Sequence, residues 1–568
     1  MILSYSRQAE ISARMLAASP SWRRLCELGR GVDAETLEMI LAQAAGLAEE
    51  AVAPINVDAD RIGCRLENGR VITPPGFREA WRAVADAGWL AGDLPEEAGG
   101  MGLPLAVHTA AQTLFDRACP AFVMLGGATR GGAFVLLRFT DEAMRGEWVP
   151  RLASGEWSAT ICISEPGAGS DVGRIRTRAA QADDGSWRIS GQKCWISFGD
   201  HDMTDRIGHL CLARTGDPAS GTRGLSLFLV PSVLDDGTRN RIAIERIEHK
   251  LGLHGSPTCV MQFEDATGYL IGSEGRGLSH IFVMIERMRL STAGQGVGAA
   301  SAALDIGLRY AQERRQGGSP AEPPVVIAAH PDVKRQLAVI ESRTEVVRAF
   351  LLELGVLLDL AAAEDDAELR ALVAWLMPLA KNFGAETAFE VASGAIQILG
   401  GAGYTNEWPA EQILRDTRIL SIFEGTTGIQ ALDLLHRRLW GEEAAGLHAF
   451  LGLMKQEAET VRGADAASAD LALSIGERFE SLAGRYAKMQ ERRVAAEAGA
   501  DPFMRAAWAA ARAWMALRLI CMGGEDETGS RLAALGRFAL LEAEADLLSA
   551  AYLAEHLPNE LPAELYTA

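Results

Sequence analysis

Apolar residues recur at helical spacing through about the first 150 residues of the chain. In 33–53 they fall on one face, with Glu35 near the start. Residues 76–87 and 104–118 have the same spacing, and a glycine-rich loop lies between them at 95–102. The pattern predicts a mostly helical N-terminal region.

The spacing changes to short, turn-punctuated segments after Gly155. Asp183-Asp184-Gly185 is a hairpin turn signal between the short segments 176–179 and 187–190. Residues 225–230 form an apolar run that Pro231 ends, and similar segments continue to about Gly272. We expect a β domain here.

Helical spacing returns at about Gly277 and continues to the end. Residues 280–313 predict a long amphipathic helix, a Pro-rich loop follows at 319–331, and a helix opens at Asp332. Further helices are predicted at 370–400, at 428–440 and beyond Gly441. The predicted fold is mostly α with a central β domain, and the predicted domains are 1–157, 158–275, 276–440 and 441–568.

The composition narrows the classes of partner. With 568 residues the chain is long enough for three or four domains of about 150 residues. Fifty-five Lys and Arg against 75 Asp and Glu give a net charge of -20, and no long basic run is present. Such a chain repels nucleic acid and anionic membranes, so neither is expected as a partner.

Targeting and membrane signals are absent from the pattern. The N-terminus lacks a basic head followed by an apolar core, and the most apolar long stretch, 506–522, is interrupted by Arg512 and Arg518. The eight cysteines contain no CxxC pair and predict reduced core thiols. We therefore expect a cytoplasmic enzyme without a membrane span.

One carboxylate, Glu424, stands between an apolar run and Gly425-Thr426-Thr427. An apolar setting raises the pKa of a carboxyl group, and a general base working near neutral pH needs a raised pKa. The alternative is an ordinary helix start with Glu424 in the first turn and Gly425 as punctuation. Residues outside this stretch decide between the two.

Two segments of the predicted β domain suit a nucleotide cofactor. Residues 164–171 (SEPGAGSD) leave backbone N–H groups uncovered and add a hydroxyl, which suits a pyrophosphate; the alternative is a plain turn. Residues 191–197 (GQKCWIS) place an aromatic beside a hydroxyl, which can wall a flat ring; the alternative is a half-buried core Trp.

Other patterns resolve to ordinary structure or stay open. Residues 309–318 close a long helix with several Arg, which suits either phosphate binding or a solvated helix end. The string at 294–299 (GQGVGA) matches a dinucleotide-binding turn but lies within a helical pattern, so we interpret it as small residues for close helix packing. The histidines do not fall at metal-ligand spacings, and no metal site is predicted.

Seven stretches in this order and spacing resemble the acyl-CoA dehydrogenase family over nearly the whole chain. They are GWLAGDLPEEAGGMGLP, CISEPGAGSD, ISGQKCWIS, LGLHGSPTCVMQFEDATGYLIG, YAQERRQGG, QILGGAGYTNEWPAEQILRD and IFEGTTGIQ. The stretches GDHDMTDRIGHLCLAR, HGSPTCVMQFEDATGYLIG and HPDV, with the long C-terminal extension, are similar to the branch with 3-methylmercaptopropionyl-CoA dehydrogenases and broad-range mycobacterial fatty acyl-CoA dehydrogenases.

The resemblance implies a helical N-terminal domain, a β domain and a helical bundle, with FAD between the last two and reaching a neighbouring subunit. Glu424 matches the family's catalytic base, and Gly425 lies beside it in the substrate site. Arg289 matches an arginine at the mouth of the acyl-CoA site. The matched FAD contacts are Ile163, Ser164, Ser170, Trp195, Ser197, Arg314, Gln397, Gly401 and Thr426. Ser170 is also assigned to the substrate site.

The sequence departs from the family pattern at several of these positions. Ser164 and Ser197 stand where threonine is frequent, and both keep a hydroxyl. Gly428 replaces a frequent glutamine, which puts one FAD contact in doubt. Some relatives carry the base on the long helix, but the residues here are Arg287 and Met288, so Glu424 is the matched candidate.

The implied reaction is α,β-dehydrogenation of an acyl-CoA to the trans-2-enoyl-CoA, as in β-oxidation within fatty acid metabolism. By resemblance, the Glu424 N–H and an FAD hydroxyl stabilise the thioester oxygen, a type of contact that lowers a barrier by about 3–4 kcal/mol. The implied partners are electron-transfer flavoprotein and a second copy of the chain, with a dimer favoured over a tetramer. Chain length and sulfur content of the acyl group stay open.

Three alternatives stay open. An acyl-CoA oxidase would share the fold and the base but pass electrons to O2. Some proteins of this fold bind duplex DNA, but the net charge of -20 and the acidic segments 524–527 and 542–546 oppose that function. The region after Gly441 is either a partner-docking module or an intramolecular cap.

Overall fold

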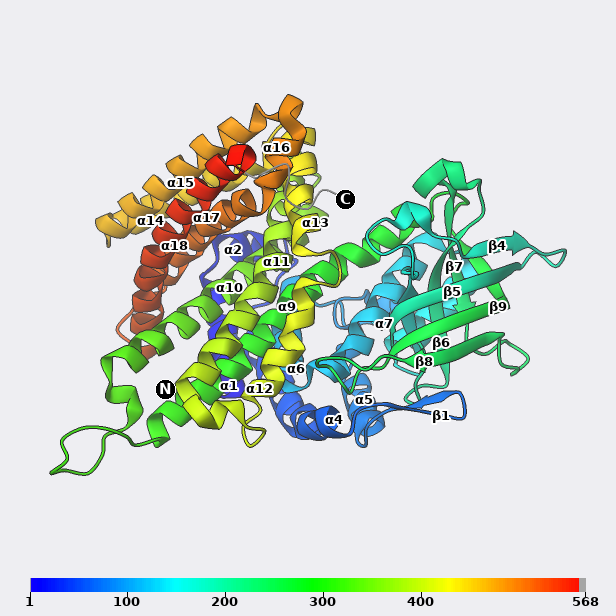
Figure 1. Cartoon of the computed structure of the whole chain (residues 1–568), viewed down its shortest axis with the longest axis horizontal. Coiled ribbons are helices and arrows are strands. Elements are labelled where there is room, and N and C mark those ends of the chain that lie inside the picture. Colours follow the sequence, from blue (N-terminus) through cyan, green and yellow to red (C-terminus); the bar gives the residue numbers. More distant parts are fainter. Residues whose placement is uncertain (1, 561–568) are drawn as a thin grey trace. The chain divides into compact units, whose positions relative to one another are not determined.

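The computed structural model describes residues 2–560 and has two compact units. The first consists of Met1–Ala45, Pro104–Arg117 and Thr292–Ala568, and the second of Gly46–Leu103 and Ala118–Ser291. The long helix α9 (Gly277–Glu313) begins in the second unit and ends in the first. Each unit is therefore built from segments that are distant in sequence (Figure 1).

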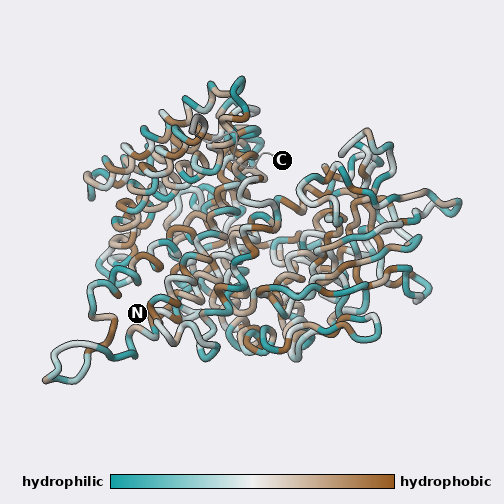
Figure 2. The backbone as a smooth tube through the Cα atoms, viewed as in Figure 1, coloured by the Kyte–Doolittle hydropathy of each residue, from teal (hydrophilic) through white to brown (hydrophobic). Residues whose placement is uncertain are grey.

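The first unit is helical throughout its described part. Besides the end of α9, its helices are α1 (Tyr5–Ala18), α2 (Pro20–Glu27), α3 (Ala34–Leu47), α6 (Leu105–Ala118), α10 (Pro331–Ala363), α11 (Ala367–Leu399), α12 (Ala410–Thr417), α13 (Thr427–Leu432), α14 (Ala445–Arg462), α15 (Ala466–Ala487), α16 (Arg493–Ala498), α17 (Ala500–Cys521) and α18 (Glu527–Glu560). Apolar and polar residues alternate around these helices (Figure 2), as the periodicity of the sequence predicts.

Small residues let three of these helices approach closely. A Cβ added at Gly296 of α9 would collide with the backbone of Gly384 in α11, and one added at Gly298 would collide with the backbone of Asp116 in α6. The glycine string at 294–299 therefore serves helix packing, as expected, and is not a dinucleotide-binding turn.

The loop from α9 to α10 projects away from the bundle (Figure 1).

The C-terminal helices α14 to α18 belong to the same unit as α10 and α11. Helix α17 is buried along nearly its whole length. Its Trp508 ring stacks on the Phe383 ring of α11 with 4.9 Å between the ring centres. Its Trp514 ring packs edge-on against the Phe350 ring of α10 with 6.5 Å between the ring centres. The extension after Gly441 therefore packs on its own chain through a central apolar helix.

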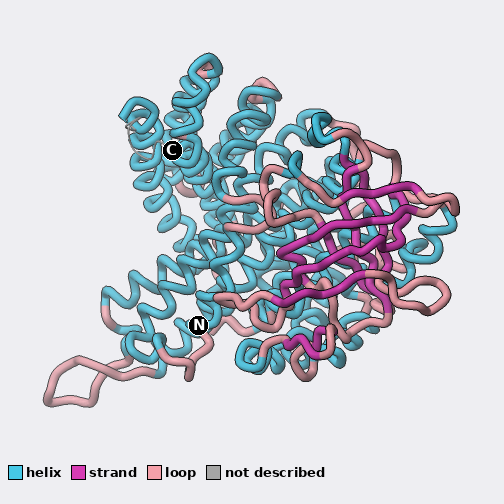
Figure 3. Tube along the Cα trace, turned by 45° about the vertical axis from the view of Figure 1, so that its right-hand side comes forward, coloured by secondary structure: helices cyan, strands magenta, loops and turns pink. Residues whose placement is uncertain are grey.

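The second unit contains the strands of the predicted β domain (Figure 3). They are β3 (Trp157–Cys162), β4 (Arg178–Gln181), β5 (Trp187–Ser197), β6 (Arg206–Arg214), β7 (Leu225–Pro231), β8 (Ile242–Ile247) and β9 (Thr258–Ile271). The order is β3-β6-β4-β5-β9-β7, and an additional β6–β7 pairing closes the sheet on itself. The predicted hairpin is confirmed, with Gln181 opposite Trp187.

An apolar cluster fills much of the inside of this closed sheet. Phe228, Met261 and Phe263 are buried there together with Cys162, Cys211 and Cys259. All eight cysteines are free thiols, and Cys521 is the exposed one among them. Burial raises the pKa of the Cys211 thiol to about 11, so it stays protonated as an ordinary core residue.

The helices of the second unit are α4 (Asn56–Ile62), α5 (Phe77–Asp86), α7 (Pro120–Phe139), α8 (Glu142–Ala153) and the start of α9. Helix α7, rather than 506–522, is long and apolar enough to cross a membrane, but 72% of its apolar window is buried within the protein. Such burial is typical of a core helix.

A two-stranded hairpin within the N-terminal region was not predicted. Strands β1 (Arg65–Glu67) and β2 (Arg70–Ile72) are joined by Asn68 and Gly69, whose φ angles are 52° and 75°. Asn-Gly favours this turn because both residues tolerate positive φ. The signal is present in the sequence, but the helical spacing on both sides obscures it.

Candidate active site

Glu424 lies in a short loop of the first unit between a 3-10 helix (Arg418–Ser421) and α13. Its φ is 54°, in the left-handed region that few residues other than glycine adopt, and Gly425 follows at 98°. The N-cap of α13 is Thr426, whose hydroxyl accepts a hydrogen bond from the Ile429 N–H. Glu424 therefore precedes the helix, and the alternative of a first-turn residue is wrong.

The backbone of this loop is held by two buried polar side chains. The Lys381 ammonium of α11 donates to the Gly425 carbonyl at 2.6 Å. The Gln430 amide of α13 donates to the carbonyls of Glu424 and Gly425 at 3.3 and 3.4 Å. These bonds hold the carbonyls toward the bundle, so the loop keeps its unusual conformation with Glu424 half-buried.

Sequence reasoning missed Lys381 and Gln430. Both lie within helical patterns, where a lysine or a glutamine is most often a solvated residue. Their solvent exposure is 0% each. The helical spacing of the apolar residues in α11 places Lys381 on the same face as core residues. That spacing is the sequence signal that could have identified it.

The segment after β3 in the second unit has open space around its glycines. The N–H of Glu165 bonds the Ala168 carbonyl and the N–H of Ala168 bonds the Glu165 carbonyl, both at 3.0 Å, which forms a tight turn. No atom lies within 4 Å of a Cβ built on Gly167 or Gly169, and Ser170 is exposed. This open space would let the turn approach an anionic group closely, and the pyrophosphate contact of this segment stays a prediction.

A buried ion pair anchors that turn to the sheet. The Lys193 ammonium of β5 lies 2.9 Å from the Glu165 carboxylate and also donates to the carbonyl oxygens of Ile163 and Leu212. Lys193 and Glu165 were not predicted as site residues. Trp187 and Ile189 point inward on β5, and the two-residue period of a strand then places Lys193 on the same inner face.

Trp195 is exposed rather than half-buried in the core. The register of β5 against β9 shifts between Lys193 and Ile196, and Trp195 adopts a φ of 62° in this irregularity. Its exposed fraction is 63%, so the ring is presented at the surface of the unit. The N–H of Cys194 donates to the Ser164 carbonyl at 3.0 Å, which ties the Trp195 segment to the segment after β3.

Arg287 and Arg289, in the first half of α9, have different environments. Arg289 is buried, with its guanidinium 5.9 Å from the centre of the Phe282 ring. Arg287 forms an ion pair with Asp93 at 2.7 Å and lies over the Phe134 ring at 3.3 Å. Asp93 also pairs with Arg130, so Arg287 occupies a packed ionic cluster of the second unit.

Four other predicted residues lie exposed on the first unit. Arg314 follows α9, Gln397 is in the last turn of α11, and Gly401 follows that helix with no atom within 4 Å of a built Cβ. Thr426 is the exposed N-cap of α13. Ile163, Ser164, Ser170, Trp195, Ser197 and Arg289 belong to the second unit, so the predicted residues fall into one set per unit.

Within residues 2–560, no group of three or more His, Cys, Asp or Glu side chains could hold a metal ion. Two histidines buried in the β domain have hydrogen-bond partners in the protein. His201 bonds the Ser158 hydroxyl at 3.0 Å and the Met203 N–H at 3.1 Å, and His209 bonds the Thr160 hydroxyl at 2.8 Å. Burial lowers the pKa of each to about 4, so both are neutral at physiological pH.

Three family models match consecutive parts of the chain. They are the N-terminal domain of acyl-CoA dehydrogenases at 34–156, the middle domain at 160–266 and the C-terminal domain at 275–439. Together these segments span well over half of the sequence. The sequence is also similar to curated proteins along most of its length.

The 3-methylmercaptopropionyl-CoA dehydrogenase of Ruegeria pomeroyi is 40% identical over 466 residues, which are 80% of this chain and 78% of that protein. A broad-specificity linear acyl-CoA dehydrogenase of Mycobacterium tuberculosis is 35% identical over 77% of this chain and 76% of its own length. Among solved structures, the glutaryl-coenzyme A dehydrogenase complex with glutaryl-CoA has 26% identity and a TM-score of 0.61, covering 71% of this chain and 97% of that one.

The C-terminal extension also has a structural counterpart. ACDH-11 of Caenorhabditis elegans in complex with C11-CoA has a TM-score of 0.76 and covers 96% of this chain and 91% of its own. At 21% identity this likeness concerns the fold alone. It extends the shared architecture past residue 439 into the last helices.

Proposed function

The chain belongs to the acyl-CoA dehydrogenase family, and we propose that it removes two hydrogens from the α and β carbons of an acyl-CoA thioester to give the trans-2-enoyl-CoA. The observation that carries this proposal is the conformation of Glu424. Bonds from Lys381 and Gln430 hold the Glu424 backbone at a positive φ, a conformation that costs free energy in a residue other than glycine. Residues in such strained conformations cluster at functional sites. Glu424 also stands where the family has its base.

The residues present fit FAD as the cofactor. The open turn around Gly167 and Gly169, with the hydroxyl of Ser170, suits a pyrophosphate, and the exposed Trp195 ring with Ser164 and Ser197 suits the edge and face of a flat ring system. When bound, FAD accepts the β-hydrogen as hydride. By the family resemblance, Arg314, Gln397, Gly401 and Thr426 contact its adenosine-diphosphate part.

The chain's own residues then perform the proton chemistry. The Glu424 carboxylate removes the α-proton. By the family resemblance, the Glu424 backbone N–H donates to the thioester oxygen, where negative charge develops. Gly425 lies beside Glu424 in the proposed substrate site, and its missing side chain leaves room for the Gln430 amide, whose nitrogen would lie 2.7 Å from a Cβ at this position. Arg289 and Ser170 are proposed to contact the acyl-CoA, and the buried position of Arg289 suits a residue that closes the site.

Electron-transfer flavoprotein is the proposed electron acceptor, and O2 is the alternative. The relatives named above act on a sulfur-containing acyl-CoA and on linear acyl-CoAs, so these two groups are the first substrates to compare. A cytoplasmic location and a role in fatty-acid β-oxidation complete the proposal. Hydrogen peroxide formed at the rate of turnover would favour an acyl-CoA oxidase.

We further propose a homodimer in which Arg314 and Gln397 reach the FAD of the second copy. Both side chains are exposed at the ends of their helices, which suits a contact with another chain. Arg314→Ala should lower FAD content without changing the rate of reduction of the FAD that remains. Sizing by light scattering checks the dimer itself.

The experiment that tests the reaction is an anaerobic titration of the purified protein with a panel of acyl-CoA thioesters. Loss of the oxidised flavin absorption with one chain length would support the cofactor, the reaction and the substrate class together. Glu424→Gln should keep the flavin but lose reduction by at least about a hundredfold, whereas Glu407→Gln, at an exposed carboxylate of the same unit, should behave as wild type. Wild-type rates in Glu424→Gln would contradict the assignment of the base.

A further inference from the structure

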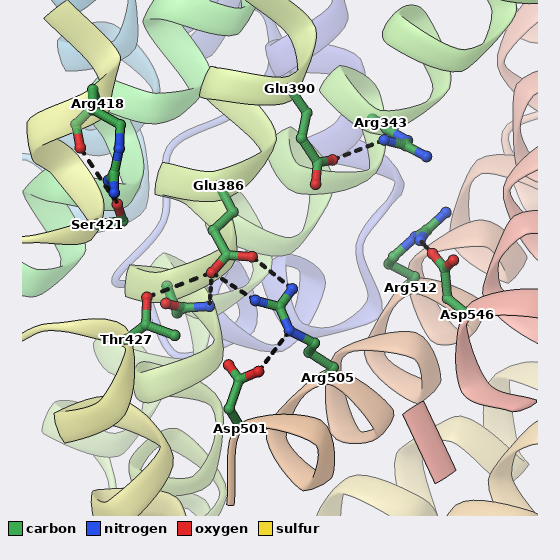
Figure 4. Close-up of polar contacts among 11 residues, drawn as sticks. Arg343, Glu386, Glu390, Arg418, Ser421, Thr427, Asp501, Arg505, Arg512 and Asp546 are labelled. Carbon is green, nitrogen blue, oxygen red and sulfur yellow. Dashed lines mark hydrogen bonds and ion pairs between the residues drawn. The ribbon is translucent and has the colours of Figure 1, made fainter. Parts of the chain in front are cut away.

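An arginine of the C-terminal extension makes a two-pronged ion pair with the helix that supports the Glu424 loop (Figure 4). The guanidinium of Arg505, on α17, donates to both carboxylate oxygens of Glu386, on α11, at 2.8 and 3.2 Å. Its Nε donates to Asp501 at 2.9 Å, one turn earlier on α17. Three bonds therefore fix the orientation of the guanidinium plane.

Glu386 connects this arginine to the start of α13. Its Oε1 also accepts from the Asn382 amide at 3.2 Å and faces the Thr427 hydroxyl at 3.5 Å. Thr427 is the first residue of α13, three positions after Glu424. The Glu386 side chain is 19% exposed, so its charge is poorly solvated and depends on the arginine for compensation.

The ion pair is reinforced by packing and by electrostatics. Three residues after Arg505, the Trp508 ring stacks on Phe383 of α11 at an interplanar angle of 4°. Burial lowers the pKa of Arg505, but the charge and hydrogen bonds of Glu386 and Asp501 raise it above the usual value. The guanidinium is therefore charged at any working pH. The ion pair and the ring stacking together fix the position of α17 along α11.

The same stretch of α11 holds the Glu424 loop directly. Lys381, five residues before Glu386, donates to the Gly425 carbonyl, and Gln430 on α13 donates to both loop carbonyls. The loop is thus suspended between α11 and α13. Glu386 joins these two helices to each other and, through Arg505, to the C-terminal extension.

We propose that Arg505 is a positioning residue for Glu424, by which the C-terminal helical extension sets the geometry of the base. The proposal rests on the proposed function for the role of Glu424. Without the arginine, Glu386 would turn toward solvent to hydrate its charge and release Thr427 and Asn382. The start of α13 would then loosen, and Glu424 would leave the left-handed conformation for part of the time.

A matched arginine separates this role from general support. Arg343 of α10 pairs with Glu390 of α11 at 2.8 Å (Figure 4). Arg343 also pairs with Glu542 of α18 at 2.8 Å. It thus joins the extension to the bundle as Arg505 does, but within residues 2–560 neither Arg343 nor Glu390 is bonded to α13. Its side chain is 28% exposed against 42% for Arg505, so its loss is at least as damaging to packing.

The test compares Arg505→Met, Arg505→Lys and Arg343→Met as FAD-containing full-length protein. In Arg505→Met we expect the rate of flavin reduction at saturating acyl-CoA to fall about tenfold or more, with little change in the substrate concentration at half-saturation. Hydrogen exchange of the backbone amides in 423–430 should accelerate in the same variant. Arg505→Lys should recover part of the rate, because lysine keeps the charge but not the two-pronged geometry.

Arg343→Met should keep the wild-type rate and the wild-type exchange in 423–430. An equal loss in Arg343→Met, or an unchanged rate and exchange in Arg505→Met, would overturn the proposal. If Arg505→Met does not fold, the double variant Arg505→Met with Glu386→Gln removes the uncompensated charge at position 386. Because the tie from α17 to α11 is still lost, the double variant should show a defect of the same kind but smaller than tenfold, and wild-type rate and exchange would overturn the proposal. If acyl-CoAs do not reduce the wild-type flavin, the proposed function fails, while the exchange measurement still decides whether Arg505 holds the loop.

Discussion

The ammonium of Lys193 lies 2.9 Å from the carboxylate of Glu165 inside the closed sheet, with solvent exposures of 0% and 7%. Its other donors reach the carbonyls of Ile163 and Leu212, while Glu165 also accepts from the N–H groups of Arg176 and Thr177. Every proton of the ammonium is used. The turn proposed to bind pyrophosphate is thus anchored by a satisfied buried ion pair.

Replacing Lys193 with methionine should destabilise the protein by about 3–5 kcal/mol, because Glu165 is left buried without its counter-charge. The variant should also purify with less flavin, since the turn carrying Ser170 loses its anchor. Thermal melting and the flavin-to-protein absorbance ratio measure both effects. Arg188→Met is the control, because its ion pair with Asp184 is largely exposed and contributes about 0–1 kcal/mol.

Lys381→Met should slow flavin reduction by about tenfold or more while keeping the flavin, because the Gly425 carbonyl loses the donor that holds it. The unpaired carbonyl should also cost about 1–3 kcal/mol of stability. Stopped-flow reduction and melting provide the two readouts. Lys455→Met, at an exposed lysine of α14, should leave both unchanged; full activity in Lys381→Met would show that the loop holds its shape without this bond.

Stability should fall as pH drops from 6.5 to about 4. Burial lowers the pKa of His201 and His209 from 6.5 to about 4, so in this window the unfolded chain binds protons that the folded chain cannot. Each histidine should contribute a loss of about 3 kcal/mol across the window, with no further loss below it. Denaturant unfolding at several pH values measures the slope.

His209→Leu should reduce that slope by about half, because one of the two buried imidazoles is removed. The exposed His556 provides the matched control, and His556→Leu should leave the slope unchanged. An unchanged slope in His209→Leu would mean that His209 is protonated in the folded protein.

The C-terminal extension should separate from α10 when Arg518 is replaced by methionine. This arginine of α17 pairs with Glu353 of α10 at 2.8 Å and with Glu457 of α14 at 2.6 Å, and all three side chains are buried. Two buried carboxylates would remain, at a cost of about 3–5 kcal/mol. Limited proteolysis should then cut within the extension, whereas the exposed-site control Arg462→Met should resist as wild type does.

The order of elements was largely determined by the sequence. The turn signal at 183–185 with the short segments after it predicted β5, and the helical period of 280–313 predicted α9 because burial of one helix face imposes that spacing whatever the partner is. Glu424 could be singled out as well, since a carboxylate after an apolar run and before Gly-Thr-Thr is a local pattern. The same pattern left open whether Glu424 begins a helix.

Only the tertiary structure decided which distant residues hold these positions. The partners of Glu165, Gly425 and Glu386 are Lys193, Lys381 and Arg505, and the last is 119 residues away in sequence. The sequence does not distinguish a lysine or arginine at the surface from one that is paired in the core. The spacing of apolar residues indicates which face of a helix or strand is buried, but it does not identify the residue that packs against that face. Charge pairing inside a protein depends on that identity, and the identity is set when the chain folds.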